Sequence, residues 1–134
     1  MEQVTSKVQN ILRNTDEQYN QAVLKCREIF EKKTYDSGTA WRILRTSSFT
    51  DQIFIKAQRV RTIEETKDQK VMDSIEDEYI GIMNYCVIAL LQISLDENEE
   101  LNIPAENAIQ LYDDKLNEVK ELMEAKNHDY GEAW

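Results

Sequence analysis

Helix-breaking residues are almost absent from this chain, and that scarcity constrains its fold more than any other feature. The 134 residues include only three glycines and one proline. Sandwiches and barrels need frequent turns, which draw on these two residue types, whereas long helices exclude both. Hydrophobic residues make up 41% and charged residues 31% of the chain, a mixture typical of amphipathic helices. We therefore expect an all-α helical bundle forming a single domain over residues 1–134.

Apolar residues recur at helical spacing in five segments. The fourth is the best defined, because its apolar stripe runs without interruption from Ile75 to Ile93. Thr15 and Gln18 have the spacing of a capping box, and Ser48 or Thr50 is a candidate N-cap for the third helix. The predicted helices cover residues 2–13, 15–33, 50–68 and 72–93 and a segment that starts near Pro104.

Two segments carry specific expectations about burial. Residues 34–50 lose the helical period and read as an ordered loop, which Trp41 is expected to seal. The fifth helix has an apolar stripe that would face the core. Its members are Ala108, Leu111, Tyr112, Leu116, Val119, Leu122 and Met123.

The chain is strongly acidic, which limits its partners. Its formal net charge is −10 and its pI is near 4.6, so it would repel the phosphate backbone of long nucleic acids. A single nucleotide remains compatible, because carboxylates can hold Mg²⁺ and the metal can carry the phosphates. The longest apolar run, residues 86–91, is too short to span a membrane, and no signal peptide is visible. These features favour a cytoplasmic protein. Cys26 and Cys86 each fall among apolar residues at helical spacing, so both are expected to be free thiols in the core.

Residues 19–41 resemble residues 112–134 at a constant offset of 93. Both segments end in an Asp-x-Gly-x-Ala-Trp motif, which is carried by Asp36, Gly38 and Trp41 in the first and by Asp129, Gly131 and Trp134 in the second. We interpret the first repeat as residues 19–93 and the second as incomplete. The natural chain is therefore expected to continue past Trp134.

Several motifs resemble a bacterial and phage family, the nucleotide-modification-associated domain 1 group. They comprise residues 35–42, 47–51, Lys56, residues 59–61 and residues 78–85. The resemblance implies nucleotide metabolism or base modification. The expected helix arrangement of this chain also resembles that of the MazG-like all-α nucleotide pyrophosphohydrolases. In those enzymes a Glu-Glu-x-x-Glu helix and a Glu-x-x-Asp helix hold Mg²⁺ on the substrate phosphates.

The acidic residues fit that pattern only partly. Glu64, Glu65 and Asp68 have Glu-Glu-x-x-Asp spacing, and Glu78 takes the glutamate place on the next helix. Gly81 stands where the aspartate ligand would be, although Glu76 and Asp77 are nearby substitutes. Each of these carboxylates is equally compatible with a solvated helix face or an ion pair. Glycine in a helix also costs about 1 kcal/mol relative to alanine, unless a close approach makes the missing side chain useful.

Lys56 and Arg59 are candidates for binding phosphate, or for pairing with Glu76 or Glu78. The leading hypothesis is a nucleotide-associated protein related to Mg²⁺-dependent nucleoside triphosphate pyrophosphohydrolases, with its site between the third and fourth helices. The alternative is a non-catalytic module that binds a nucleotide or another protein. Wide apolar helix faces also predict a homodimer, which would sediment at about twice 15.8 kDa.

Overall fold

The computed structural model describes residues 2–66, 72–95, 97 and 100–130, whose regular structure is entirely helical. The elements are α1 (Glu2–Ser37), the short 3-10 helix η1 (Ala40–Ile43), α2 (Thr46–Thr66), α3 (Met72–Ser94) and α4 (Ala105–Tyr130). The all-α class is therefore confirmed. The described residues form four α-helices, so the prediction of five was wrong.

The error lies in α1, which runs through the break predicted near residue 14. No glycine or proline occurs between residues 1 and 37, so nothing in the backbone forces the helix to stop there. The capping-box spacing at Thr15 is therefore not a helix start. The helix ends instead ahead of Gly38, whose φ of 66° lies in the left-handed region that favours glycine. The Gly38 amide donates to the carbonyl of Thr34 at 2.8 Å and closes the last turn.

The start of α2 also differs from the prediction. The helix begins at Thr46, and neither Ser48 nor Thr50 is its N-cap. Thr50 Oγ1 instead donates to the carbonyl of Thr46, four residues earlier in the same helix, at 3.4 Å. By contrast, the prediction of a central helix over residues 72–93 is confirmed by α3. Pro104 immediately precedes α4, and its carbonyl accepts the Ala108 amide at 3.0 Å.

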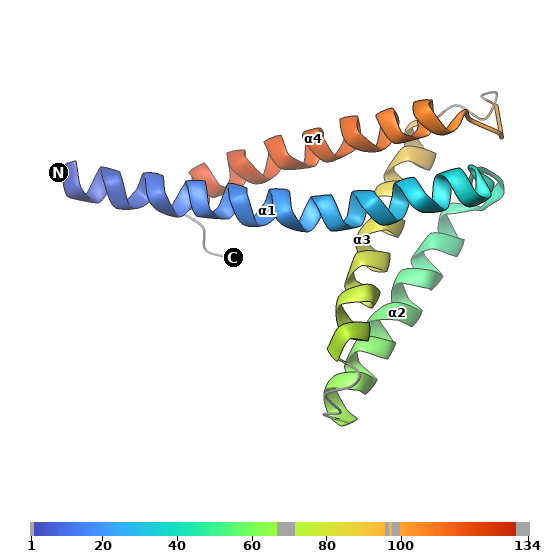
Figure 1. Ribbon diagram of the computed structural model, residues 1–134, viewed down its shortest axis with the longest axis horizontal. Helices are drawn as coiled ribbons and strands as arrows, with labels where there is room; N and C mark the ends of the chain where they lie inside the picture. Colours follow the sequence, from blue (N-terminus) through green and yellow to red (C-terminus); the bar gives the residue numbers. More distant parts are fainter. Residues whose placement is uncertain (1, 67–71, 96, 98–99, 131–134) are drawn as a thin grey trace.

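The helices form two antiparallel pairs (Figure 1). The first pair is α1 with α4, and the second is the hairpin of α2 with α3, which projects to one side of the first pair. The C-terminal half of α3 packs against both α1 and α4, whereas the main partner of α2 is α3. None of the described helices is long and apolar enough to cross a membrane.

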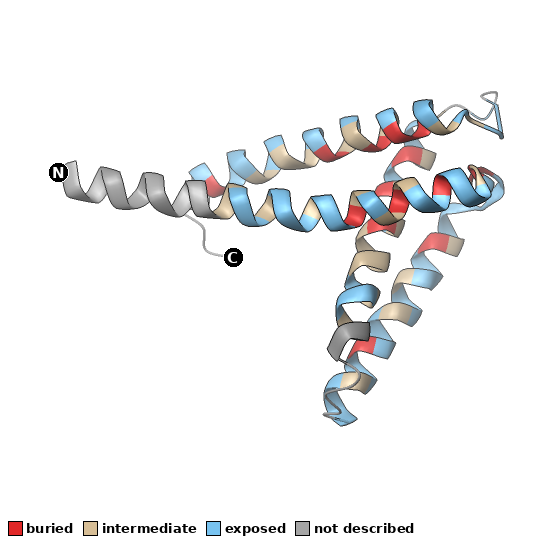
Figure 2. Ribbon diagram, viewed as in Figure 1, coloured by how far each residue is buried: buried red, intermediate tan, exposed pale blue. Residues whose placement is uncertain are grey.

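The hydrophobic core lies where α1, α3 and α4 meet (Figure 2). Its centre is a stacked pair of rings, Phe30 from α1 and Tyr112 from α4, with centroids 4.2 Å apart. Ala108 and Leu116 of α4 are buried as predicted, but Leu122 is 58% exposed. The prediction failed there because the second half of α4 runs beside α1 alone, beyond the reach of α3.

A chain of buried hydrogen bonds joins the same three helices. The Tyr112 hydroxyl donates to Asn84 Oδ1 of α3 at 2.7 Å, and Asn84 Nδ2 donates to the carbonyl of Cys26 in α1 at 3.1 Å. At the surface, Arg27 makes a bidentate pair with Asp113 through bonds of 2.8 and 3.1 Å. These polar contacts fix the relative register of α1, α3 and α4.

Replacing Tyr112 with phenylalanine is expected to destabilise the fold by about 1 to 3 kcal/mol, because buried Asn84 Oδ1 would lose its donor. Burial also raises the pKa of the Tyr112 phenol well above its ordinary value of 10.0. Folding therefore favours the neutral phenol, and this contribution to stability is lost as the pH rises above 10.0. Urea unfolding followed by circular dichroism, at neutral pH and above pH 10, measures both effects.

Tyr19→Phe is the matched control, because the Tyr19 hydroxyl donates to the carbonyl of Leu116 at 3.0 Å from a less buried position. The control should lose less stability than Tyr112→Phe. Equal stability of Tyr112→Phe and the unaltered protein at neutral pH would refute the role given to the buried hydroxyl.

Candidate functional site

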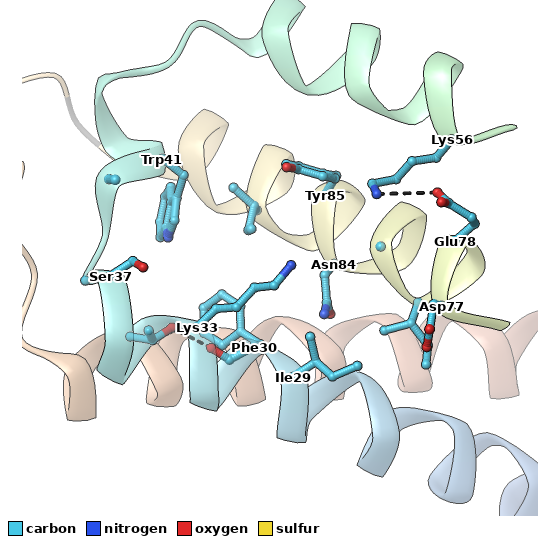
Figure 3. A pocket seen from close by; sticks show the side chains of 16 residues that line it. Ile29, Phe30, Lys33, Ser37, Trp41, Lys56, Asp77, Glu78, Asn84 and Tyr85 are labelled. Carbon is cyan, nitrogen blue, oxygen red and sulfur yellow. Dashed lines mark hydrogen bonds and ion pairs between the residues drawn. The ribbon is translucent and has the colours of Figure 1, made fainter. Parts of the chain in front are cut away.

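A cavity of about 720 Å³ lies between the C-terminal half of α1, η1, α2 and the middle of α3. Its volume falls in the usual range of small-molecule sites. Aromatic side chains in its wall come from three elements: Phe30 from α1, Trp41 from η1 and Tyr85 from α3. Figure 3 shows Trp41 at one end of the cavity and the charged side chains of α2 and α3 at the other.

Two lysines and two carboxylates line this cavity: Lys33, Lys56, Asp77 and Glu78. The amino groups of Lys33 and Lys56 both point into the cavity, from α1 and α2 respectively (Figure 3). Lys33 has no carboxylate partner among the described residues, whereas Lys56 lies 3.4 Å from Glu78. The cavity thus combines aromatic surface with cationic groups that can bind an anion.

Glu78 is shared between two cations. Its Oε2 lies 3.4 Å from Lys56 Nζ, and its Oε1 lies 3.7 Å from Arg59 Nη1. The side chains of Lys56 and Glu78 are only 19% and 16% exposed, whereas Arg59 is 60% exposed. Lys56 Nζ also lies 5.9 Å from the centroid of the Tyr85 ring, within the range of a cation–π contact. The ion pair expected between α2 and Glu78 is therefore present.

Gly81 allows Lys56 to take this position. A Cβ atom on residue 81 would lie 2.9 Å from Lys56 Cε, a separation that real Cβ atoms essentially never show, and 3.1 Å from Lys56 Nζ, which is tighter than most real Cβ contacts. The close approach that justifies a glycine in this helix is therefore that of the Lys56 side chain. This role for Gly81 is not readable from the sequence, because it depends on how α2 packs against α3.

The Trp41 ring is partly buried and packs against the hydrophobic core. Its indole nitrogen Nε1 is buried and has no hydrogen-bond acceptor among the described residues. Buried donors in folded proteins nearly always have a partner, and a missing one costs about 1 to 3 kcal/mol. The loop expected over residues 34–50 is largely helical, and Trp41 lies in η1 with Gly38 just before it.

Three other predicted metal ligands, Glu64, Glu65 and Glu76, do not line this cavity. Glu64 and Glu65 are exposed residues near the end of α2 that border a separate hollow of about 470 Å³, and Glu65 pairs with Arg61 at 3.7 Å. Glu76 pairs with Lys25 at 2.6 Å, and Asp68 lies outside the described residues. Within the described part of the chain, no three His, Cys, Asp or Glu side chains are grouped so that they could hold a metal ion.

The repeat motifs are described only in part. Asp36 is exposed at the end of α1, and Asp129 is exposed near the end of α4, 3.7 Å from His128. Gly131 and Trp134 lie outside the described residues, so the second motif and the repeat stay predictions.

Sequence reasoning did not select Phe30, Lys33, Asn84 or Tyr85 as parts of a site, although all four line the cavity. Lys33 lies two residues before the motif that begins at Tyr35, and the available signal was a basic residue at the end of a predicted helix, next to an aromatic loop. Asn84 belongs to the recognised segment 78–85 but carries no pattern of its own.

Residues 33–93 match the family model described as nucleotide modification associated domain 1. The matched segment is shorter than half of the chain, and it includes Lys33, Trp41, Lys56, Glu78 and Tyr85 of the cavity wall. No curated protein and no solved structure matches the chain. The region similar to a nucleotide-associated family therefore coincides with most of the cavity.

Proposed function

We propose that the cavity binds a nucleotide, with the base at the Trp41 end and the phosphate between Lys33 and Lys56. The observation that carries this proposal is the combination, in one cavity, of aromatic rings with two inward-pointing lysines. Aromatic faces stack on any base, and ammonium groups bind phosphate oxygens. The match of residues 33–93 to a nucleotide modification associated domain supports the same ligand class.

The indole of Trp41 would give the base a point of attachment once the ring turns its buried Nε1 toward the cavity. A carbonyl or ring nitrogen of a base is a hydrogen-bond acceptor, so it would supply what Nε1 lacks in the described structure. The aromatic surface alone would accept any base, whereas a directional bond to Trp41 would favour bases with an acceptor at that point.

A second candidate function is Mg²⁺-dependent hydrolysis of a nucleoside triphosphate, as in the MazG-like enzymes. The observation in its favour is that Asp77 and Glu78 line the same cavity as the two lysines. Two carboxylates beside bound phosphates are a common way to recruit Mg²⁺, which takes its other ligands from phosphate and water. Glu64, Glu65 and Glu76 would have no direct role in a site limited to this cavity.

One face of α3 carries exposed apolar side chains that could form the interface of the expected homodimer. Tyr79, Leu90 and Ile93 of α3 are 53%, 43% and 70% exposed, and their spacing places them on one side of the helix. Exposed apolar side chains gathered on one helix face favour association, and sedimentation at the mass of one 15.8 kDa chain would exclude it.

Trp41→Phe tests nucleotide binding, because it keeps an aromatic ring and removes only the N–H. We expect affinity for nucleotides, measured by isothermal titration calorimetry, to fall about fivefold through loss of one hydrogen bond. Thermal stability should stay unchanged or rise slightly, because the variant no longer buries an unpaired donor. Tyr35→Phe, at a 60% exposed position outside the cavity, is the matched control. Binding that is unaffected by Trp41→Phe would contradict the placement of the base.

Single-turnover reactions of nucleoside triphosphates with Mg²⁺ test the hydrolytic candidate. If it is correct, pyrophosphate is released, and Asp77→Asn slows the release at least about tenfold because one metal ligand is lost. Asp51→Asn, on the exposed surface of α2, should leave the rate unchanged. Absence of pyrophosphate with every triphosphate tried would remove hydrolysis and leave the binding proposal intact.

A further inference from the structure

We propose that the cavity is selective for nucleoside monophosphates, and that the phosphate takes Lys56 from Glu78 while Arg59 keeps Glu78 neutralised. This inference rests on the nucleotide-binding function proposed above. It adds the ligand class and the rearrangement of side chains by which the site accepts that ligand.

The ion pairs around Glu78 are long. Its contacts of 3.4 Å with Lys56 and 3.7 Å with Arg59 are longer than the roughly 2.7 to 2.9 Å of strong charge-assisted hydrogen bonds. The Lys25–Glu76 pair in the same protein is 2.6 Å long. Glu78 is thus held by two loose contacts, and either can be exchanged without breaking a short hydrogen bond.

Glu78 would keep a cationic partner after Lys56 turned to the phosphate. A mostly buried carboxylate that loses its only cation is strongly destabilised. Arg59 reaches the other oxygen of Glu78, and its largely exposed side chain can move closer. Lys56 can therefore turn to an incoming phosphate without leaving an uncompensated charge.

The side chain of Lys56 has room to move at Gly81. The absence of a side chain at Gly81 leaves room for the lysine, which passes directly over this residue on its way to the cavity. The Tyr85 face beside the amino group stabilises the cation without fixing it in one hydrogen-bonded position. Gly81 is therefore a positioning residue for Lys56.

The balance of charge then selects the ligand class. With Glu78 paired to Arg59, the cavity offers two cations, Lys33 and Lys56, to an anion. A phosphate monoester carries about 1.5 to 2 negative charges at neutral pH, which these two lysines match. The further phosphates of a triphosphate would add negative charge beside Asp77 and Glu78, at a cost in like-charge repulsion. Without a divalent cation, the monophosphate should bind more tightly.

Gly81→Ala tests this inference with little risk to the fold. The new Cβ would displace the flexible end of Lys56, whereas alanine is favoured over glycine in a helix by about 1 kcal/mol. We expect the thermal stability to stay unchanged or rise. The affinity for nucleoside monophosphates should fall at least about tenfold, because the bond between Lys56 and the phosphate is lost and hydrogen bonds between charged groups are stronger than those between neutral groups. Affinity for the parent nucleosides, which lack the phosphate, should not change.

The measurement is calorimetric titration, without Mg²⁺, of the monophosphates, triphosphates and parent nucleosides of the common bases. Lys56→Gln is a second variant, for which we expect the same loss of affinity for nucleoside monophosphates. Lys32→Gln, on the exposed surface of α1, is the matched control. Failure of every nucleotide and nucleoside to bind would overturn the proposed function and this inference together. Nucleotide binding that favours triphosphates, or that Gly81→Ala and Lys56→Gln leave unchanged, would overturn this inference alone.

Discussion

The packing of Tyr112 against Phe30 and Asn84 is the contact on which the rest of the structure depends. The ring of Tyr112 stacks on Phe30 of α1 at 4.2 Å, and its hydroxyl bonds to Asn84 of α3 at 2.7 Å. Phe30 and Asn84 are also part of the cavity wall. Tyr112 of α4 therefore holds in place two residues of the cavity wall, Phe30 from α1 and Asn84 from α3. The core behind this inner wall thus determines the shape of the cavity.

The outer wall of the cavity has a different origin, because α2 packs mainly on α3, whereas the core is formed by α1, α3 and α4. This arrangement keeps Lys56 close to α3 while the cavity stays open between the hairpin and α1 (Figure 3). A cationic residue held over a glycine and beside an aromatic ring is well placed to receive an anion. The site is thus a consequence of two helix pairs that meet at one end and diverge at the other.

The sequence predicted the helical class and the bounds of α3 because both follow from local signals. The apolar stripe of α3 is long, and the single glycine within this helix does not interrupt its helical period. The division of α1 into two helices was wrong because a capping-box spacing has meaning only where the preceding residues leave the helix. Leu122 was misplaced because periodicity shows which side of a helix is apolar and does not show how far its neighbour extends.

The candidate site was predictable to a similar extent. Lys56, Asp77 and Glu78 were predicted to lie near one site because they are on consecutive helices that were expected to pair, and all three line the same cavity. Their roles in binding metal or phosphate stay predictions. Glu64 and Glu65 lie about two turns or more beyond Lys56 on α2, so helical pairing carries them to a different hollow. Trp41 and Gly81 owe their roles to contacts between elements, which a single sequence does not reveal.

The most direct measurement of the central claim, that this cavity holds the base of a nucleotide, is the indole N–H resonance of Trp41 in a ¹⁵N-labelled sample. The chain has two tryptophans, and the Trp41→Phe variant identifies which resonance belongs to residue 41. Titration with nucleoside monophosphates should shift the Trp41 indole resonance in a saturable way as its proton gains an acceptor. A Trp41 indole resonance that stays in place while other resonances of the protein shift to saturation would show that the nucleotide binds elsewhere.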